Sequence, residues 1–183
     1  MSKRLDCIQL GVEYSKRGKQ LYRHLIPLKG LLQKNYGKRF DCTLTSLACI
    51  FGEKYYATIE RIAEKYGYDG DKNGTNPFVV RCITQELANK IKVKGKAKSA
   101  YGKSIGWTWG MVKRLIAKNT PVVLNLWDDG RKYYHDHTVT IVGVEEYQCG
   151  KFLIVLDNWN ESVSLIDYNK LCVISSINWF EKG

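Results

Sequence analysis

The chain has helical periodicity in its first part and strand periodicity in its second part. Apolar residues spaced i, i+3, i+4, i+7 predict four helices, over residues 42–52, 54–67, 77–91 and 109–119. From Thr120 onward the period changes to two, which predicts consecutive strands over 121–127, 137–147, 151–159, 162–167 and 171–180. Helices followed by an antiparallel sheet are typical of an α+β fold, with a helical part packed against a sheet part.

Two further stretches alternate as strands do. Residues 7–14 and 21–28 flank a turn at 16–19, so residues 1–32 are expected to form an N-terminal hairpin extension. Lysines at every second position over 90–98 predict a strand with one charged face. No linker, repeat or low-complexity tract interrupts the chain, so we expect a single domain over 1–183.

The first predicted helix begins with a cysteine. Asp41 is expected to be the N-cap, which places Cys42 in the first turn, and Gly52 ends the helix. Free main-chain N–H groups and the positive end of the helix dipole favour a thiolate there. The sequence therefore predicts a lowered thiol pKa and a reactive sulfur at Cys42. The simpler interpretation is that Cys42 is a small buried apolar residue.

A histidine and an aspartate lie at the ends of two predicted strands. His137 opens the strand 137–147, and Asp157 ends the strand that would pair with it. If both side chains share a face, the Asp157 carboxylate can accept a hydrogen bond from one imidazole nitrogen of His137. The other nitrogen could then face the thiolate of Cys42, as cysteine acyl-transfer chemistry requires.

Three segments carry a family resemblance: DC at 41–42, HTVTIVGV at 137–144 and LIVLDNW at 153–159. They resemble the motifs of the papain-like cysteine protease superfamily, in that family's order of Cys, His and Asp or Asn. More narrowly, residues 33–170 are similar to the bacteriocin-processing (double-glycine) peptidase-like branch. The resemblance implies a papain-like α+β fold, with the nucleophile on a helix N-terminus packed on a C-terminal antiparallel sheet.

The same resemblance assigns roles. By it Cys42 is the nucleophile, His137 the general base and Asp157 the orienting residue. Asn158 is an alternative third member, and Trp159 is expected to shield the hydrogen bond between base and orienting residue. The implied activity is that of a cysteine peptidase, or a related amide hydrolase, acting on a peptide or protein through a thioester.

The oxyanion donor departs from the family pattern. Family members commonly have Gly after the nucleophile and Gln about six residues before it, where this chain has Thr43 and Tyr36. Gln33, or less favourably Asn35, is expected to substitute, together with the main-chain N–H of Cys42. If neither side chain reaches the site, the protein would be a weak enzyme or a catalytically silent relative.

The sequence gives little support for metals or cofactors. His135 lies two residues before His137 and could share a metal site or act as the base in its place, but no carboxylate or cysteine at ligand spacing completes a site. The acidic loop at 69–73 lacks the glycine and glutamate of a calcium loop. The six cysteines are expected to be reduced thiols rather than a disulfide framework. We expect no metal and no cofactor.

Charge adds a second candidate function. Of the net charge of +11, residues 1–40 hold ten Lys or Arg against two acidic residues, and residues 90–103 hold six lysines and no acid. A silent papain-like module could use the basic N-terminal surface to bind an acidic protein or, less favourably, nucleic acid. Transglutaminase-type acyl transfer is a further alternative. Because the sequence contains no signal peptide or transmembrane run, we expect a cytoplasmic protein without membrane contact.

Overall fold

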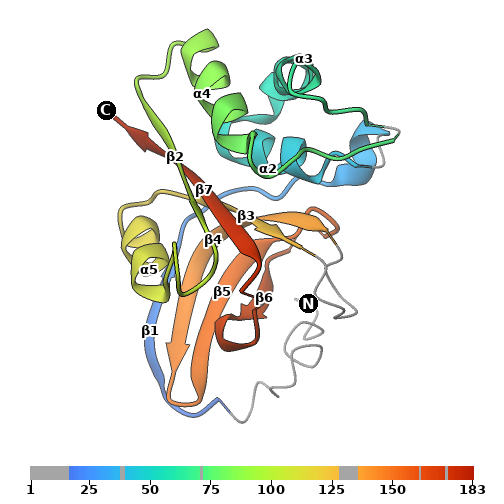
Figure 1. Ribbon diagram of the computed structural model, residues 1–183. Helices are drawn as coiled ribbons and strands as arrows, with labels where there is room; N and C mark the ends of the chain where they lie inside the picture. Colours follow the sequence, from blue (N-terminus) through green and yellow to red (C-terminus); the bar gives the residue numbers. More distant parts are fainter. Residues whose placement is uncertain (1–16, 38–39, 71, 128–135, 161, 172) are drawn as a thin grey trace.

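The computed structural model describes residues 17–37, 40–70, 72–127, 136–160, 162–171 and 173–183. The α-helices of these ranges are α2 (Cys42–Phe51), α3 (Tyr56–Glu64), α4 (Val80–Lys90) and α5 (Trp109–Ala117). The strands are β1 (Gln20–Leu25), β2 (Gly95–Tyr101), β3 (Val122–Leu126), β4 (His137–Tyr147), β5 (Gly150–Leu156), β6 (Ser164–Asp167) and β7 (Ser175–Lys182). Short 3-10 helices are η2 (Gln33–Tyr36), η3 (Glu53–Tyr55) and η4 (Tyr168–Lys170). The predicted α+β class is confirmed (Figure 1).

All the strands join one antiparallel sheet. Its order is β2-β7-β3-β4-β5-β6, and β1 pairs with β4 outside this path. The long β4 pairs with β3 through its first half and with β1 through its second half, while β5 lies along its other edge. A β-bulge between Ile141 and Gly143 marks the change of partner. A Cβ at Gly143 would lie 2.6 Å from the main-chain oxygen of His24, so this crossing needs glycine.

The sheet is buried on both faces, and alternate residues of each strand enter different cores. Val122 and Leu124 pack with α5 on one face, whereas Val123 packs with α2, α3 and α4 on the other. In β4, Ile141 and Val142 divide between the two faces in the same way. Figure 1 shows α2, α3 and α4 gathered at one end of the molecule, with α5 apart from them. The continuous apolar runs of β3 and β4 follow from this two-sided burial.

Several predicted boundaries were wrong because tertiary pairing overrides local alternation. Helix α4 continues to Lys90 and β2 begins only at Gly95, so the alternating lysines do not share one strand. Strand β2 lies between α4 and α5 in the chain and pairs with the C-terminal β7, so the helices do not all precede the sheet. The last strand starts at Ser175, later than expected. The first strand of the predicted hairpin, 7–14, lies outside the described residues.

No helix among the described residues has the length and apolar character that crossing a bilayer requires. The longest of them, α4, has 11 residues. A membrane-spanning helix needs about 20 apolar residues.

Replacing Leu44 by alanine is expected to lower the free energy of unfolding by about 2–5 kcal/mol. The Leu44 side chain is fully buried in the core that joins α2 to the sheet, so its removal leaves a cavity that the packed neighbours cannot fill. Urea unfolding followed by circular dichroism measures the change. Leu21→Ala is the control, because that side chain is 59% exposed, and should change stability by less than about 0.5 kcal/mol. Equal effects of the two substitutions would contradict this packing.

Candidate active site

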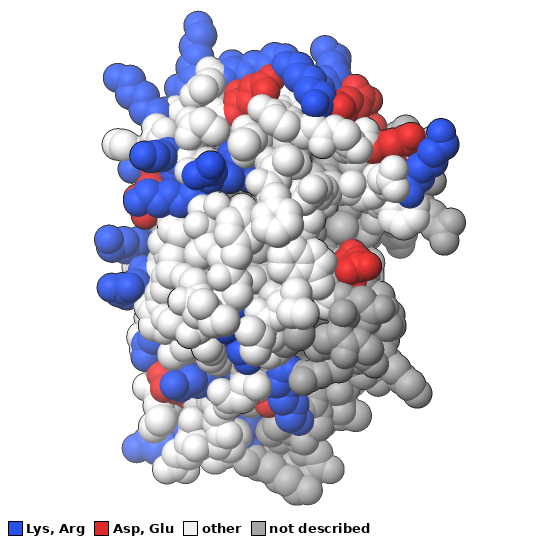
Figure 2. Space-filling model, in the orientation of Figure 1, with Lys and Arg blue, Asp and Glu red and all other residues white. Residues whose placement is uncertain are grey.

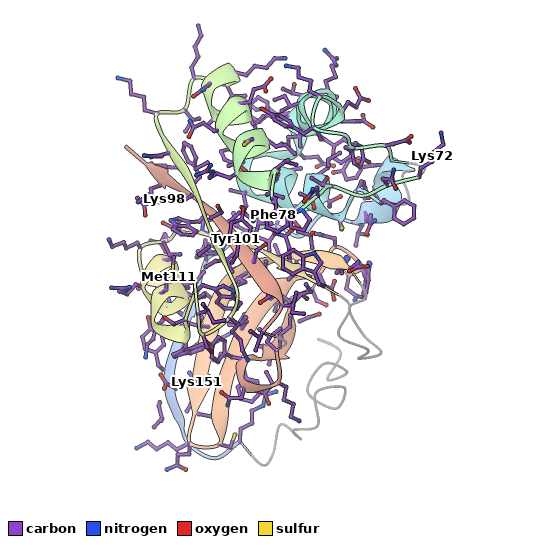
Figure 3. The ribbon with its side chains drawn as sticks, in the orientation of Figure 1. Lys72, Phe78, Lys98, Tyr101, Met111 and Lys151 are labelled. Carbon is purple, nitrogen blue, oxygen red and sulfur yellow. The ribbon has the colours of Figure 1, made fainter. Side chains whose placement is uncertain are left out.

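A cleft of about 1170 Å³ opens between the helical layer and one end of the sheet. Its walls come from the start of α2, the start of β4, the turn after β5 and the loop between α3 and α4. The lining residues on which the site depends are Gln33, Cys42, Thr43, His137, Thr138 and Trp159. Figure 3 shows Lys72, also a lining residue, on the outer part of the α3–α4 loop, pointing away from the body of the molecule. The cleft therefore combines a thiol, an imidazole and amide donors from segments far apart in the sequence.

Cys42 is the first residue of α2 and is partly exposed, as the sequence predicted for a helix N-terminus. The sequence predicted a lowered pKa for this thiol, and the structure indicates the opposite direction. Burial raises the pKa of the Cys42 thiol above its ordinary value, and hydrogen bonds from Thr138 and from the main chain of Thr43 offset this only in part. The nearby charge of Asp41 raises it further. Near pH 7 the resting side chain is therefore a neutral thiol.

His137 is buried at the first position of β4, with 5% of its surface exposed. Its Nε2 lies 2.7 Å from the main-chain oxygen of Asp157. Because a carbonyl oxygen only accepts hydrogen bonds, Nε2 carries the proton and Nδ1 keeps the lone pair. Burial lowers the pKa of His137, while the hydrogen bond to Asp157 and the charge of that residue raise it in part. The imidazole is therefore neutral near pH 7, with Nδ1 as its basic atom.

The Asp157 carboxylate has other partners than the one expected from the sequence. Oδ1 accepts hydrogen bonds from the main-chain N–H groups of Trp159 and Asn160, both at 3.0 Å. Oδ2 accepts from the Ser164 hydroxyl at 2.7 Å. Among the hydrogen bonds of the described residues, His137 meets Asp157 at its main-chain carbonyl rather than at its carboxylate. The carboxylate thus fastens the turn after β5, and this turn presents the carbonyl to the imidazole.

Trp159 stacks on the imidazole. The ring centroids of His137 and Trp159 lie 4.2 Å apart, with 24° between the ring planes. The indole is half exposed and covers one face of the imidazole. This contact limits rotation of the imidazole and keeps water from one face of it.

Asn158, the alternative third member, points away from the imidazole into the interface between α2 and β4. Its side-chain amide donates to the main-chain oxygen of Cys42 at 3.1 Å, to the Ser46 hydroxyl at 2.9 Å and to the main-chain oxygen of Thr138 at 3.1 Å. Asn158 has φ 65°, a conformation that asparagine tolerates better than most residues. It therefore ties the segment of the nucleophile to the segment of the base.

A buried chain of hydroxyl and amide groups below the cleft was not foreseen from the sequence. Thr43 and Thr138 share a hydrogen bond of 2.9 Å between their hydroxyls. The Thr138 hydroxyl donates to Asn125, which donates to Ser176, each at 3.0 Å. The available signal was polar residues at inward positions of apolar strands, such as Asn125 within VVLNL. This series of hydrogen-bonded side chains joins α2, β4, β3 and β7 beneath Cys42 and His137.

The two candidate oxyanion donors are placed differently. Gln33 lines the cleft, and its main-chain N–H donates to the carbonyl of Asn158 at 2.9 Å. Asn35 belongs to the same short helix η2 but is exposed and is not part of the cleft lining. The structure thus brings Gln33, Cys42 and His137 to one cleft. His135, the alternative base, lies outside the described residues.

Asp157→Asn is expected to slow the reactions of Cys42 with esters by no more than about 10-fold. In a triad oriented by a carboxylate, the same change typically costs about 10⁴ in rate. Here the imidazole is held by a main-chain carbonyl, which the substitution retains, and asparagine still offers one oxygen to the turn. The measurement is the rate at which p-nitrophenyl acetate acetylates Cys42, with Ser164→Ala as the matched control on the same carboxylate. A loss above about 1000-fold in a folded variant would show that the carboxylate itself acts on His137.

Comparison with known proteins gives no family assignment. No protein-family model matches the chain, and no curated protein matches it. Among solved structures it is similar to a chain from work on the structural basis for the limited antibody cross reactivity between the mite allergens Blo t 1 and Der p 1, with 16% identity and a TM-score of 0.37. The match covers 72% of this chain and 48% of that chain, so this protein spans about half the length of its neighbour. A similarity at this level assigns neither family nor function, which leaves the geometry of the cleft to indicate the chemistry.

Proposed function

We propose that the protein is a cysteine peptidase, or a related amide hydrolase, of papain-like arrangement. The observation that carries the proposal is the hydrogen bond from His137 Nε2 to the Asp157 carbonyl, because it makes Nδ1 the basic atom in a cleft that also contains Cys42. Thr138, the neighbour of His137, shares a hydrogen bond of 2.9 Å with Thr43, the neighbour of Cys42, so the segment that carries the base contacts the segment that carries the nucleophile. Nucleophile, base and orienting acceptor are the parts that acyl transfer needs.

The papain-like arrangement is supported by the elements that carry these groups. The nucleophile begins α2 in the helical layer, and the base begins β4 in the antiparallel sheet. The cleft lies where these two layers meet. The sequence motifs imply the same arrangement, in which the thiol comes from the helical part and the imidazole from the sheet part.

Catalysis would start from a neutral thiol and a neutral imidazole. As Cys42 Sγ attacks the substrate carbonyl carbon, its proton passes to Nδ1 of His137. The carbonyl oxygen becomes an oxyanion, which accepts hydrogen bonds from the main-chain N–H of Cys42 and the side-chain amide of Gln33 in this proposal. Nδ1 then gives its proton to the leaving amine as the carbon–nitrogen bond breaks, which leaves a thioester. Water attacks this thioester with His137 as base, and the proton returns to Sγ as the carboxylic acid leaves.

Peptide cleavage by the native protein tests this proposal. The protein is incubated with a library of peptides from a digested proteome, and new peptide termini are identified by mass spectrometry. The proposal predicts new termini that are missing when Cys42→Ala replaces the native protein. Repeating the incubation with a primary amine tests transglutaminase-type transfer, which would give amine adducts at glutamine instead of new termini. Identical termini with the native protein and the variant would refute the hydrolase.

A second candidate is a silent module that binds through its basic surface. Lys90, Lys92, Lys94 and Lys96 are exposed between the end of α4 and β2. In Figure 2 the Lys and Arg side chains gather at the α4 end of the molecule and along the side that carries β2 and α5, with acidic side chains scattered among them. An acidic protein or nucleic acid would be held there in a salt-dependent way. Binding that does not weaken between low and high salt would count against this candidate.

A further inference from the structure

The amide of Asn158 is buried between the segment of the nucleophile and the segment of the base, with 1% of the residue exposed. Its Nδ2 donates to three oxygens, which are the main-chain oxygens of Cys42 and Thr138, each at 3.1 Å, and the Ser46 hydroxyl at 2.9 Å. Oδ1 has no hydrogen-bond partner among the described residues, so the side chain is held through its –NH₂ group. Because carbonyl oxygens only accept hydrogen bonds, this position requires a donor.

On the side of the base, Asn158 holds a part of β4 that β5 does not reach. The pairing of β4 with β5 begins only at Thr140, so the first residues of β4 extend past the end of β5. The turn after β5 contacts them instead. The Asp157 carbonyl accepts from the imidazole of His137, and the Asn158 amide donates to the carbonyl of Thr138. Two adjacent residues of the turn therefore fix the imidazole and the main chain next to it.

On the side of the nucleophile, the same –NH₂ group meets the first turn of α2. Cys42 and Ser46 are four residues apart and thus lie on one face of the helix. The Ser46 hydroxyl also donates to the carbonyl of Thr138 at 3.4 Å, which leaves its lone pairs for the amide. The main chain of Asn158 is held separately, because its carbonyl accepts from the N–H of Gln33 at 2.9 Å. One fixed amide therefore contacts both α2 and β4.

We propose that Asn158 is a positioning residue that sets the distance between the Cys42 thiol and the His137 imidazole, by joining the main chain of α2 to that of β4. This proposal rests on the proposed acyl chemistry. It gives Asn158 a role that differs from that of a third triad member, because the amide acts on the main chain of both segments rather than on the imidazole. Proton transfer needs the two groups within hydrogen-bond reach, and a misplacement of about 1 Å can cost about 100-fold in rate.

Two substitutions remove the donor in different ways. Asn158→Asp keeps the shape of the side chain and tolerates φ 65°, but it turns an oxygen towards the three oxygens. Asn158→Gly removes the side chain, and glycine adopts this φ readily. The rate at which p-nitrophenyl acetate acetylates Cys42 is measured by peptide mass spectrometry from pH 6 to 9, for each variant alone and combined with His137→Ala. Thermal unfolding reports on folding.

At pH 7, Asn158→Asp is expected to slow acetylation of Cys42 by about 10–100-fold, and Asn158→Gly by about 10-fold. In the His137→Ala background, Asn158→Gly should change the rate by less than about three-fold, because the base that the amide positions is already gone. The pH profile should change as well. The native rate is level between pH 7 and 8, whereas the rate of Asn158→Gly should rise with pH, since attack then depends on a thiolate whose pKa is raised by burial.

Three results would overturn the proposal. Native rates in both Asn158 variants would show that the amide does not position the pair. Equal losses with and without His137, at an unchanged pH profile, would mean that Asn158 only supports the fold around α2. A native protein in which acetylation of Cys42 does not depend on His137 would refute the acyl chemistry itself, and the positioning role with it.

Ser46→Ala provides a milder variant should the Asn158 variants fail to fold. It removes one of the three oxygens that accept from Asn158 and keeps the amide in place. The proposal predicts acetylation a few-fold slower when His137 is present and unchanged when it is absent, and an equal loss in both backgrounds would contradict it.

Asn89→Asp is the matched control for the change from amide to carboxylate. Asn89 is exposed on α4, away from the lining of the cleft, and its side-chain oxygen accepts from Gln85 at 3.0 Å, which aspartate can also do. It should leave the acetylation rate of Cys42 and its pH profile as in the native protein. A loss as large as that of Asn158→Asp would show that added charge alone explains the effect, and would overturn the proposed role.

Discussion

Cys42→Ala is expected to abolish peptide cleavage, with kcat lower by on the order of 10⁶-fold, the size seen when one member of a nucleophile–base unit is removed. The sulfur forms the bond to the substrate, and Cys42 is the one cysteine among the described residues that line the cleft. The variant should fold, because alanine favours a helix and the substitution removes only the sulfur atom from the first residue of α2. Cleavage of a fluorogenic peptide chosen from the library experiment measures the rate.

The control for this substitution is Cys149→Ala. Cys149 is exposed in the turn between β4 and β5, on neither wall of the cleft. The Cys149→Ala variant should cleave the peptide at the native rate within about two-fold. A Cys42→Ala variant that folds normally and still cleaves the peptide at more than about a tenth of the native rate would remove the thiol from the mechanism.

His137→Ala is expected to reduce kcat by a similar factor and to change its pH dependence. In the native protein the pKa of His137 is lowered by burial, so the neutral base predominates at pH 7. The native rate should therefore be level around pH 7 and fall only as the pH drops below about 6.5, the ordinary histidine value. Without the base, attack needs a thiolate that Cys42 must form alone, and its pKa is raised. The residual rate of the variant should thus keep rising above pH 9.

His24→Ala is the matched control for the base. His24 is partly exposed on β1, where its Nε2 lies 3.1 Å from the side-chain oxygen of Asn119, and it is not one of the residues that line the cleft. Its removal should leave both the rate and the pH profile unchanged. An acid limb with a midpoint above pH 7 in the native protein, or a variant His137→Ala with the native profile, would contradict a buried neutral base at this position.

Much of the fold could be predicted from the sequence because strong periodicity survives tertiary packing. The helices that contain Leu44, Ile59, Ile83 and Val112 all form, since each has an apolar face that packs into one of the two cores. The β4–β5 hairpin forms as expected, with Tyr147 paired to Gly150. The pairing of β2 with β7 could not be foreseen, because alternation shows that a strand exists but does not identify its partner.

The positions of Cys42 and His137 could be predicted from the sequence, but the electrostatics of the candidate site could not. Local pattern placed Cys42 at a helix start and His137 at a strand start, and both lie in one cleft. The pKa of Cys42 could not be predicted, because the packing of β4 against α2 buries the thiol and outweighs the helix terminus. The partner of the imidazole depends on how the Asp157 turn closes, and sequence spacing does not distinguish a carboxylate from the carbonyl of the same residue.

Identification of the acylated residue tests the central claim most directly. The native protein and His137→Ala are exposed briefly to p-nitrophenyl acetate at pH 7 and digested, and acetylated peptides are quantified by mass spectrometry. The account predicts an acetyl thioester on Cys42 in the native protein, formed far faster than at any other cysteine, and its loss in His137→Ala. Acetylation spread evenly over the cysteines, or acetylation of Cys42 at the native rate without His137, would contradict a nucleophile and base acting together in this cleft.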